Sequence, residues 1–214
     1  MNDISVEEMS RRLGAVYTGA LTDILFDMGR GAQTLPHAIK PVVTGDRISA
    51  PAFTAEWAPY LSGGKSKAWD MLKSVPPGHA LIAATNIRER ASLGDLALAF
   101  LAARGCKGLV LDGGCRDIDI GTRIGLPRFC AFTTPQDASH GRGEVRRWGH
   151  EITIGEVRIR TGDFIVADTD GVVIIPKEIA KEVLVRAEAL VKEETRIREA
   201  LLAGASPDDL FPAD

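Results

Sequence analysis

The chain has 214 residues, of which 45% are hydrophobic and 26% charged, and its net charge is −3. This is typical of a globular domain, and there is no basic surplus to favour nucleic acid or an anionic membrane. Without an apolar run of about 18 residues or the pattern of a signal peptide, we expect a cytoplasmic protein and one domain spanning 1–214.

The first third of the chain alternates helical and strand patterns. Residues 5–29 have apolar positions at helical spacing, and 32–47 have no clear period and predict a connector. Residues 48–57 predict a strand, which Pro51 places at a sheet edge or a bulge. The stretch 63–67, Gly-Gly-Lys-Ser-Lys, lacks the first half of a Walker motif and is interpreted as a solvated loop rather than a phosphate site.

A helix followed by a strand is predicted in the middle of the chain. Gly94-Asp95 opens the helix, Gly105 closes it, and the inward face is expected at Leu96, Ala97, Phe100, Leu101 and Arg104. The strand, 109–111, should stop at a turn formed by Asp112-Gly113-Gly114. Asp95 is either a helix cap or part of a helix start that receives an anionic ligand.

Further elements are expected on either side of this unit. They are a helix at 68–75, strands at 79–85 and 126–132, a helix at 118–125, a loop at 133–149, a hairpin at 151–160, and strands at 164–168 and 172–176. Asp168 and Asp170 could bind a metal, but fixing hairpin turns is the favoured interpretation. The cysteines 106, 115 and 130 are odd in number and have no CxxC spacing, so reduced, structural thiols are expected.

Residues 178–202 predict one long C-terminal helix. A helical wheel places Glu194 in the middle of its apolar stripe and Glu193 to the side, in solvent. A carboxylate in an apolar stripe must be paired, protonated or used.

Asp95, Arg116 and Asp117 form the candidate site. One helix, one turn and one strand fill the twenty residues between Asp95 and Arg116. A β-α-β crossover would return the Arg–Asp pair to the sheet edge where the helix begins. A helix start, a guanidinium and two carboxylates would then surround one pocket.

Gly94-Asp95 and the stretch from Gly105 to Asp117 resemble a known family, the class II pyruvate aldolases of the 4-hydroxy-4-methyl-2-oxoglutarate/4-carboxy-4-hydroxy-2-oxoadipate (HMG/CHA) type. Their relatives are the RraA-like regulators of ribonuclease activity. The resemblance covers most of the chain, and 162–176 also fits its pattern. It departs at 62–67 and 84–86, on the expected substrate side.

The resemblance implies a metal-dependent lyase that cleaves 4-hydroxy-2-oxo acids to pyruvate by a retro-aldol reaction and also decarboxylates oxaloacetate. Asp117 would hold Mg²⁺ or Mn²⁺, Arg116 would bind the keto acid and stabilise the enolate, and Asp95 would orient a water molecule. Gly94, Asp95 and Leu96 would receive the substrate carboxylate. Glu194 is the candidate for a carboxylate supplied by a neighbouring subunit.

The same resemblance implies an α/β fold of the β/β/α swivelling-domain type, with a central sheet flanked by helices. The chain would assemble as a homotrimer or hexamer, with the helix 178–202 contacting a neighbouring subunit. Two alternatives stay open: a non-catalytic regulator that binds an RNA-degrading enzyme, and an enzyme of the same scaffold for another keto acid. Regulators of this type commonly lack the aspartate that this chain keeps at Asp95.

Overall fold

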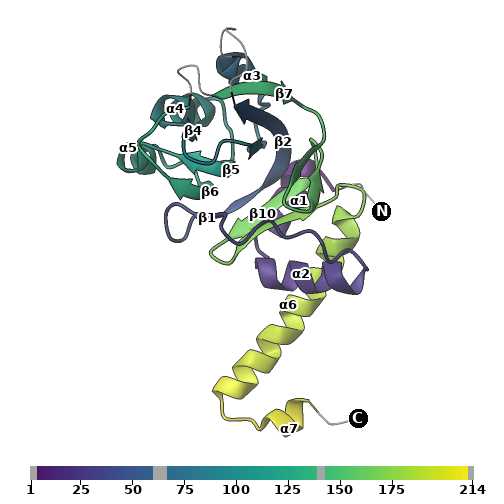
Figure 1. The fold of residues 1–214 in the computed structure, drawn as a ribbon. Coiled ribbons are helices and arrows are strands. Elements are labelled where there is room, and N and C mark those ends of the chain that lie inside the picture. Colours follow the sequence, from purple (N-terminus) through teal and green to yellow (C-terminus); the bar gives the residue numbers. More distant parts are fainter. Residues whose placement is uncertain (1–3, 60–66, 139–142, 212–214) are drawn as a thin grey trace.

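A mixed β-sheet forms the centre of the molecule (Figure 1). A computed structural model describes residues 4–59, 67–138 and 143–211. Within them the strand order is β1-β6-β5-β3-β2-β10-β11, with β4 beside β5 and β7 beside β2. These strands are β1 (Lys40–Pro41), β2 (Ile48–Pro59), β3 (Ala80–Thr85), β4 (Ala91–Leu93), β5 (Gly108–Cys115), β6 (Arg128–Thr133), β7 (Gly143–Trp148), β10 (Phe164–Asp168) and β11 (Gly171–Ile175). The predicted hairpin is a separate pair, β8 (Ile152–Ile154) and β9 (Val157–Ile159).

Helices cover two regions of the sheet (Figure 1). They are α1 (Val6–Leu13), α2 (Thr18–Asp27), α3 (Ala68–Ser74), α4 (Asp95–Ala103), α5 (Ile118–Ile124), α6 (Ala180–Leu202) and α7 (Pro207–Leu210). One apolar cluster joins α3 and α4 to β2, β3, β5 and β6, and another joins α1, α2 and α6 to β10 and β11. A third cluster fills the space between the opposite face of the central strands and the β8-β9 hairpin. The predicted α/β class with a long C-terminal helix is therefore confirmed.

The strand β2 lies inside the sheet, and its pairing is irregular between Glu56 and Trp57 rather than at Pro51, so the prediction that Pro51 marks an edge or a bulge was wrong. The first part of β2 pairs antiparallel with β10, and from Ala52 onward β2 also pairs parallel with β3. Pro51 comes directly before the first residue paired with β3, where a missing N–H breaks no ladder bond to that strand. A proline is tolerated because the strand changes neighbours at this position.

The strand β5 runs through the predicted turn. Asp112, Gly113 and Gly114 all belong to β5, which ends at Cys115. A Cβ on Gly113 would lie 1.8 Å from Thr85 Oγ1, and one on Gly114 would lie 2.4 Å from Phe132 Cε2. The two glycines are therefore required by side chains of neighbouring strands, and the pairing of β5 with β6 is irregular between Leu111 and Gly114. The chain turns only at Arg116 and Asp117.

Other boundaries also differ from the sequence expectations. The predicted loop 133–149 contains the strand β7. On α4 the buried residues are Ala97, Leu98 and Leu101, whereas Leu96 is 69% exposed, so the expected inward face was partly wrong. The loop prediction at 63–67 lies outside the described residues, apart from Lys67. No described helix is long and apolar enough to cross a membrane.

Asp168 fixes the hairpin turn, as favoured from the sequence, and also anchors α2. Its buried Oδ1 accepts hydrogen bonds from the Asp170 N–H at 3.0 Å and the Thr18 hydroxyl at 2.7 Å. Its Oδ2 accepts from the Thr18 N–H at 2.9 Å, at the start of α2. A carboxylate supplied by a distant strand thus satisfies a free amide of a helix N-terminus.

We expect Asp168→Ala to lower the free energy of unfolding by about 2–4 kcal/mol, because the buried Thr18 N–H and hydroxyl would lose their acceptor. Asp170→Ala is the matched control, since its side chain is exposed, and it should change stability by less than about 0.5 kcal/mol. Urea denaturation measures both. Equal midpoints for the two variants would show that the Asp168 carboxylate does not anchor α2.

Candidate active site

Three of the predicted site residues, Asp95, Arg116 and Asp117, lie together at the carboxyl ends of β4 and β5. The strands β4 and β5 pair in parallel, with Leu93 opposite Cys115, and α4 begins two residues after Leu93, at Asp95. The Arg116 N–H donates to the Leu93 carbonyl at 3.3 Å. The β4-α4-β5 crossover therefore brings Gly94 and Asp95 next to Arg116 and Asp117.

The Asp117 carboxylate lies at the N-terminus of α4. Its Oδ2 accepts a hydrogen bond from the Asp95 backbone N–H at 3.3 Å, and the Arg116 Nε is 3.3 Å away. A Cβ on Gly94 would be 2.3 Å from this oxygen, so only glycine leaves room for the carboxylate. The unpaired amides of a helix N-terminus stabilise a negative charge, which explains why the carboxylate is favoured in this position.

Asp117 itself adopts a left-handed backbone conformation. It caps α5 with φ 58° and ψ 45°, and it is the only described residue other than glycine with a positive φ. Aspartate tolerates this region better than most residues, but the conformation still has an energetic cost. This turn directs the carboxylate back toward Gly94 and Asp95 rather than along β5.

The cluster is open to ligands. The side chains of Arg116 and Asp117 are 35% and 30% exposed, and Asp95 is half-buried. The amides of Leu96 and Ala97 belong to the first turn of α4, where N–H groups have no acceptor within the helix. A guanidinium, two carboxylates and free amides around one point can bind a small anionic molecule and stabilise charge that develops on it.

The donor set suits a hard divalent cation held by few protein ligands. In the described part of the chain no three His, Cys, Asp or Glu side chains are arranged to hold a metal. Mg²⁺ and Mn²⁺ often bind through one or two carboxylates, with water and substrate oxygens completing the shell. Asp117 fits this pattern, because its Oδ1 makes no hydrogen bond with the described residues and its side chain reaches solvent.

A model of the RraA-like family (Aldolase/RraA) matches residues 18–174, which include the whole cluster. The chain belongs to this family. A protein of Halalkalibacterium halodurans named "Putative 4-hydroxy-4-methyl-2-oxoglutarate aldolase" is 33% identical over 168 residues, covering 78% of each chain.

Solved structures confirm the RraA-type fold that the resemblance implied. An uncharacterized protein of Pseudomonas syringae is 28% identical with a TM-score of 0.86, over 98% of this chain and 99% of that one. Streptomyces coelicolor RraAS2, described as an unusual member of the RNase ES inhibitor RraA protein family, is 26% identical with a TM-score of 0.79, over 89% and 98%. Names of both kinds, aldolase and ribonuclease inhibitor, therefore occur among the relatives of this RraA-like chain.

Glu194 is not part of the cluster within one chain. It lies in α6, which packs on α1 and α2 and extends away from α4 and α5 (Figure 1). Its side chain is 34% exposed and 3.8 Å from Arg198, whereas Glu193 is 54% exposed and pairs with Arg196. A role for Glu194 in the site of this RraA-like protein would require a second subunit and stays a prediction.

The cysteines are structural, as expected. All three are free and buried, and Cys115 and Cys130 lie with their sulfurs 3.1 Å apart between β5 and β6. The hydrogen bond with Cys130, together with burial, raises the pKa of Cys115, and burial raises that of Cys106. Cys115 is therefore a poor nucleophile, despite its position next to Arg116.

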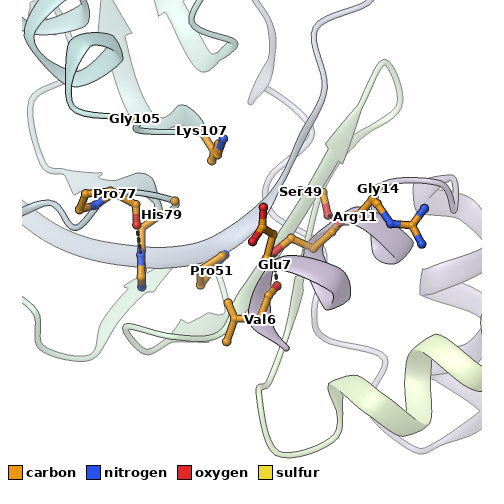
Figure 2. A pocket seen from close by; sticks show the side chains of 12 residues that line it. Val6, Glu7, Arg11, Gly14, Ser49, Pro51, Pro77, His79, Gly105 and Lys107 are labelled. Carbon is orange, nitrogen blue, oxygen red and sulfur yellow. Dashed lines mark hydrogen bonds between the residues drawn. The ribbon is translucent and has the colours of Figure 1, made fainter. Parts of the chain in front are cut away.

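A cavity of about 820 Å³ lies elsewhere in the described part of the molecule (Figure 2). It is lined by α1 residues such as Glu7, by Ser49 and Pro51 of β2, and by His79 and Lys107. His79 and Lys107 directly precede β3 and β5, so this cavity is at the amino ends of the parallel strands. Ligands of open α/β sheets bind at the carboxyl ends. The Arg116–Asp117 cluster, at the carboxyl ends of β4 and β5, is therefore the better candidate for an active site.

One residue next to the Arg116–Asp117 cluster, Arg128, was not singled out from the sequence. Arg128, the first residue of β6, is 1% exposed and lies beneath α5. The signal available in the sequence was a single charge inside the apolar segment 126–132. A fully buried arginine is unusual and requires a structural or functional reason.

Proposed function

We propose that this protein is a divalent-metal-dependent lyase that cleaves 4-hydroxy-2-oxo acids of the HMG/CHA type to pyruvate by a retro-aldol reaction. We further propose that it decarboxylates oxaloacetate, because both reactions leave the same pyruvate enolate. The observation that carries the proposal is the Asp117 carboxylate at the N-terminus of α4, beside the Arg116 guanidinium and opposite Asp95. Membership of a family with aldolase names supports it.

The residues divide the chemistry as follows. The free amides at Leu96 and the following residue bind the carboxylate of the substrate, next to the guanidinium of Arg116. Asp117 would hold Mg²⁺ or Mn²⁺, which when bound supplies a Lewis acid that polarises the 2-oxo group. Arg116 stabilises the negative charge that develops as the carbon–carbon bond breaks. The half-buried Asp95 orients a water molecule for proton transfer.

The test is to incubate the purified protein with HMG and with oxaloacetate, each with Mg²⁺ and with EDTA, and to follow pyruvate in a coupled assay. Pyruvate from either substrate that depends on Mg²⁺ supports the proposal. If neither substrate yields metal-dependent pyruvate, the lyase proposal is wrong.

The similarity to Streptomyces coelicolor RraAS2 favours a second candidate function, a non-catalytic regulator that binds an RNA-degrading enzyme. The open cluster of charged groups at the start of α4 argues against it, since a regulator has no need of a carboxylate held in a left-handed turn. Inactivity with a wider set of 2-oxo acids, together with inhibition of a purified ribonuclease E-type enzyme, would favour the regulator.

We also propose that the active form is a homotrimer or hexamer in which Glu194 of one subunit assists the cluster of its neighbour. The outer part of α6 supports this, because it carries the exposed apolar residues Leu201 and Leu202 and extends away from its own chain (Figure 1). Burial of such a surface favours association.

Glu194→Gln should lower kcat by about 100-fold without changing the oligomer, because an amide cannot exchange the proton that a carboxylate can. Glu193→Gln, one residue away and ion-paired with Arg196 in its own chain, is the matched control and should leave kcat unchanged. Steady-state kinetics and size-exclusion chromatography test both. Dissociation of the Glu194→Gln oligomer would make the residue structural, and an unchanged rate would remove it from the site.

A further inference from the structure

Arg128 is buried with fewer hydrogen-bond partners than a buried guanidinium can use, and with no ion pair to a described residue. Its side chain is 1% exposed, and its Nε and Nη1 have no hydrogen-bond partner. Its Nη2 donates to the Ile118 carbonyl at 3.2 Å and to the Thr122 hydroxyl at 3.1 Å. No described carboxylate forms an ion pair with it. An apolar side chain of the same size would be at least as stable in this position, so stability alone does not explain the residue.

Both contacts of Arg128 are to the first turns of α5, directly after Asp117. Ile118 follows Asp117 in the chain, and the Gly121 N–H donates to the Asp117 carbonyl at 2.8 Å. A Cβ on Gly121 would lie 2.3 Å from Arg128 Nη1, so the helix rests directly on the guanidinium. Arg128 thus holds the helical turn that begins at Asp117.

The turn that Arg128 holds includes the residue with a strained backbone, Asp117. Asp117 has a φ of 58°, a conformation that persists in a residue other than glycine only where its surroundings fix it. The guanidinium of Arg128 supplies this constraint, because it donates a hydrogen bond to the carbonyl of Ile118, the residue after Asp117. The strained turn in turn sets the direction of the Asp117 carboxylate toward Gly94 and Asp95.

We propose that Arg128 is a positioning residue for Asp117: by holding Ile118 and Thr122 it keeps the Asp117 carboxylate oriented to bind the divalent cation. The inference rests on the proposed function, since it assumes that Asp117 is the metal ligand. A cation held by so few protein ligands depends strongly on the orientation of each one, and loss of a residue that orients a ligand typically weakens metal affinity 10–100-fold.

The test measures binding of Mn²⁺ alone to the metal-free protein, by electron paramagnetic resonance titration without substrate. Arg128→Met should raise the Kd for Mn²⁺ by about 10–100-fold, while the urea midpoint stays equal to that of the wild type or rises. Arg123→Met is the matched control, because Arg123 is an exposed arginine on α5. This variant should bind Mn²⁺ with the Kd of the wild type. Thr122→Val removes one of the two contacts and should shift the Kd in the same direction by less.

Amide hydrogen exchange of Gly121 supplies a readout that needs no metal. If Arg128 holds the turn, this amide should exchange at least 10-fold faster in Arg128→Met than in the wild type, with core strand amides unchanged. An unchanged Mn²⁺ Kd in Arg128→Met overturns the proposal. If Arg128→Met does not fold, the Mn²⁺ Kd of Thr122→Val is the test, and an unchanged Kd in that variant overturns the proposal.

The experiment distinguishes failure of the proposed metal-dependent function from failure of the proposed positioning role of Arg128. If the wild-type protein binds no Mn²⁺, the metal-dependent function is wrong, and with it the role of Arg128 in metal binding. If the wild type binds Mn²⁺ and Arg128→Met binds it equally well, only the positioning role of Arg128 is wrong.

Discussion

Asp117→Ala should abolish metal-dependent release of pyruvate, with a fall in kcat/KM of about 1,000-fold or more. The carboxylate is the proposed metal ligand, and its Oδ2 also meets the Arg116 Nε and the Asp95 N–H, so its removal leaves the cation without its protein ligand. Coupled pyruvate assays across a Mg²⁺ series measure the effect, and excess Mg²⁺ should not restore the rate.

Two further variants separate the carboxylate from the backbone turn. Alanine is strained in the left-handed region by roughly 1–2 kcal/mol, so Asp117→Asn is needed, because asparagine tolerates this region and keeps the shape of the side chain. It should be as inactive as Asp117→Ala but closer to the wild type in stability. Asp119→Ala, an exposed aspartate on α5, should keep its activity. A near wild-type rate in Asp117→Asn would mean that Asp117 does not bind the metal.

The position of the candidate site could be predicted because its parts lie in one short unit of the chain. A helix start at Asp95, a strand and an Arg–Asp pair are local signals, and only twenty residues separate Asp95 from Arg116. A β-α-β crossover has few possible geometries, so spacing alone places its two ends together. The structure confirms this juxtaposition, through the bond between Arg116 and Leu93 and that between Asp95 and Asp117.

Several details of the fold could not be predicted, because they depend on residues distant in the sequence. Gly113 and Gly114 are typical of a turn, yet Thr85 and Phe132 from neighbouring strands require them inside β5. Pro51 is typical of an edge strand, but β2 changes neighbours at that point. In each case a tertiary contact, which no local pattern reports, overrides the usual preference of the residue.

The C-terminal helix α6 shows a second limit of sequence reasoning. The helical wheel placed Glu194 on an apolar stripe, and the stripe continues beyond the part of α6 that its own chain covers. Val183 and Ala187 are fully buried, whereas Leu201 is 39% exposed. A periodic pattern indicates which face is apolar but not which molecule covers it.

Gly94→Ala should lower kcat/KM by about 100-fold, through geometry alone. Gly94 has φ −128° and ψ −166°, an extended conformation that alanine adopts without strain. Its new Cβ would lie 2.3 Å from Asp117 Oδ2 and 2.9 Å from Arg116 Nε, so both groups must move. A displacement of about 1 Å in a catalytic group can cost about 100-fold in rate. The affinity for Mn²⁺ should fall as well, because the moved carboxylate is the proposed ligand.

Gly19→Ala is the matched control for this substitution. A Cβ on Gly19 would meet Tyr17 at an ordinary 3.5 Å, and the residue lies in α2, away from the cluster. It should keep full activity and gain up to about 1 kcal/mol in stability, because alanine is favoured over glycine in a helix. Full activity in Gly94→Ala would show that the enzyme works equally well with a displaced Asp117 carboxylate. Asp117 would then not be a metal ligand held at the start of α4.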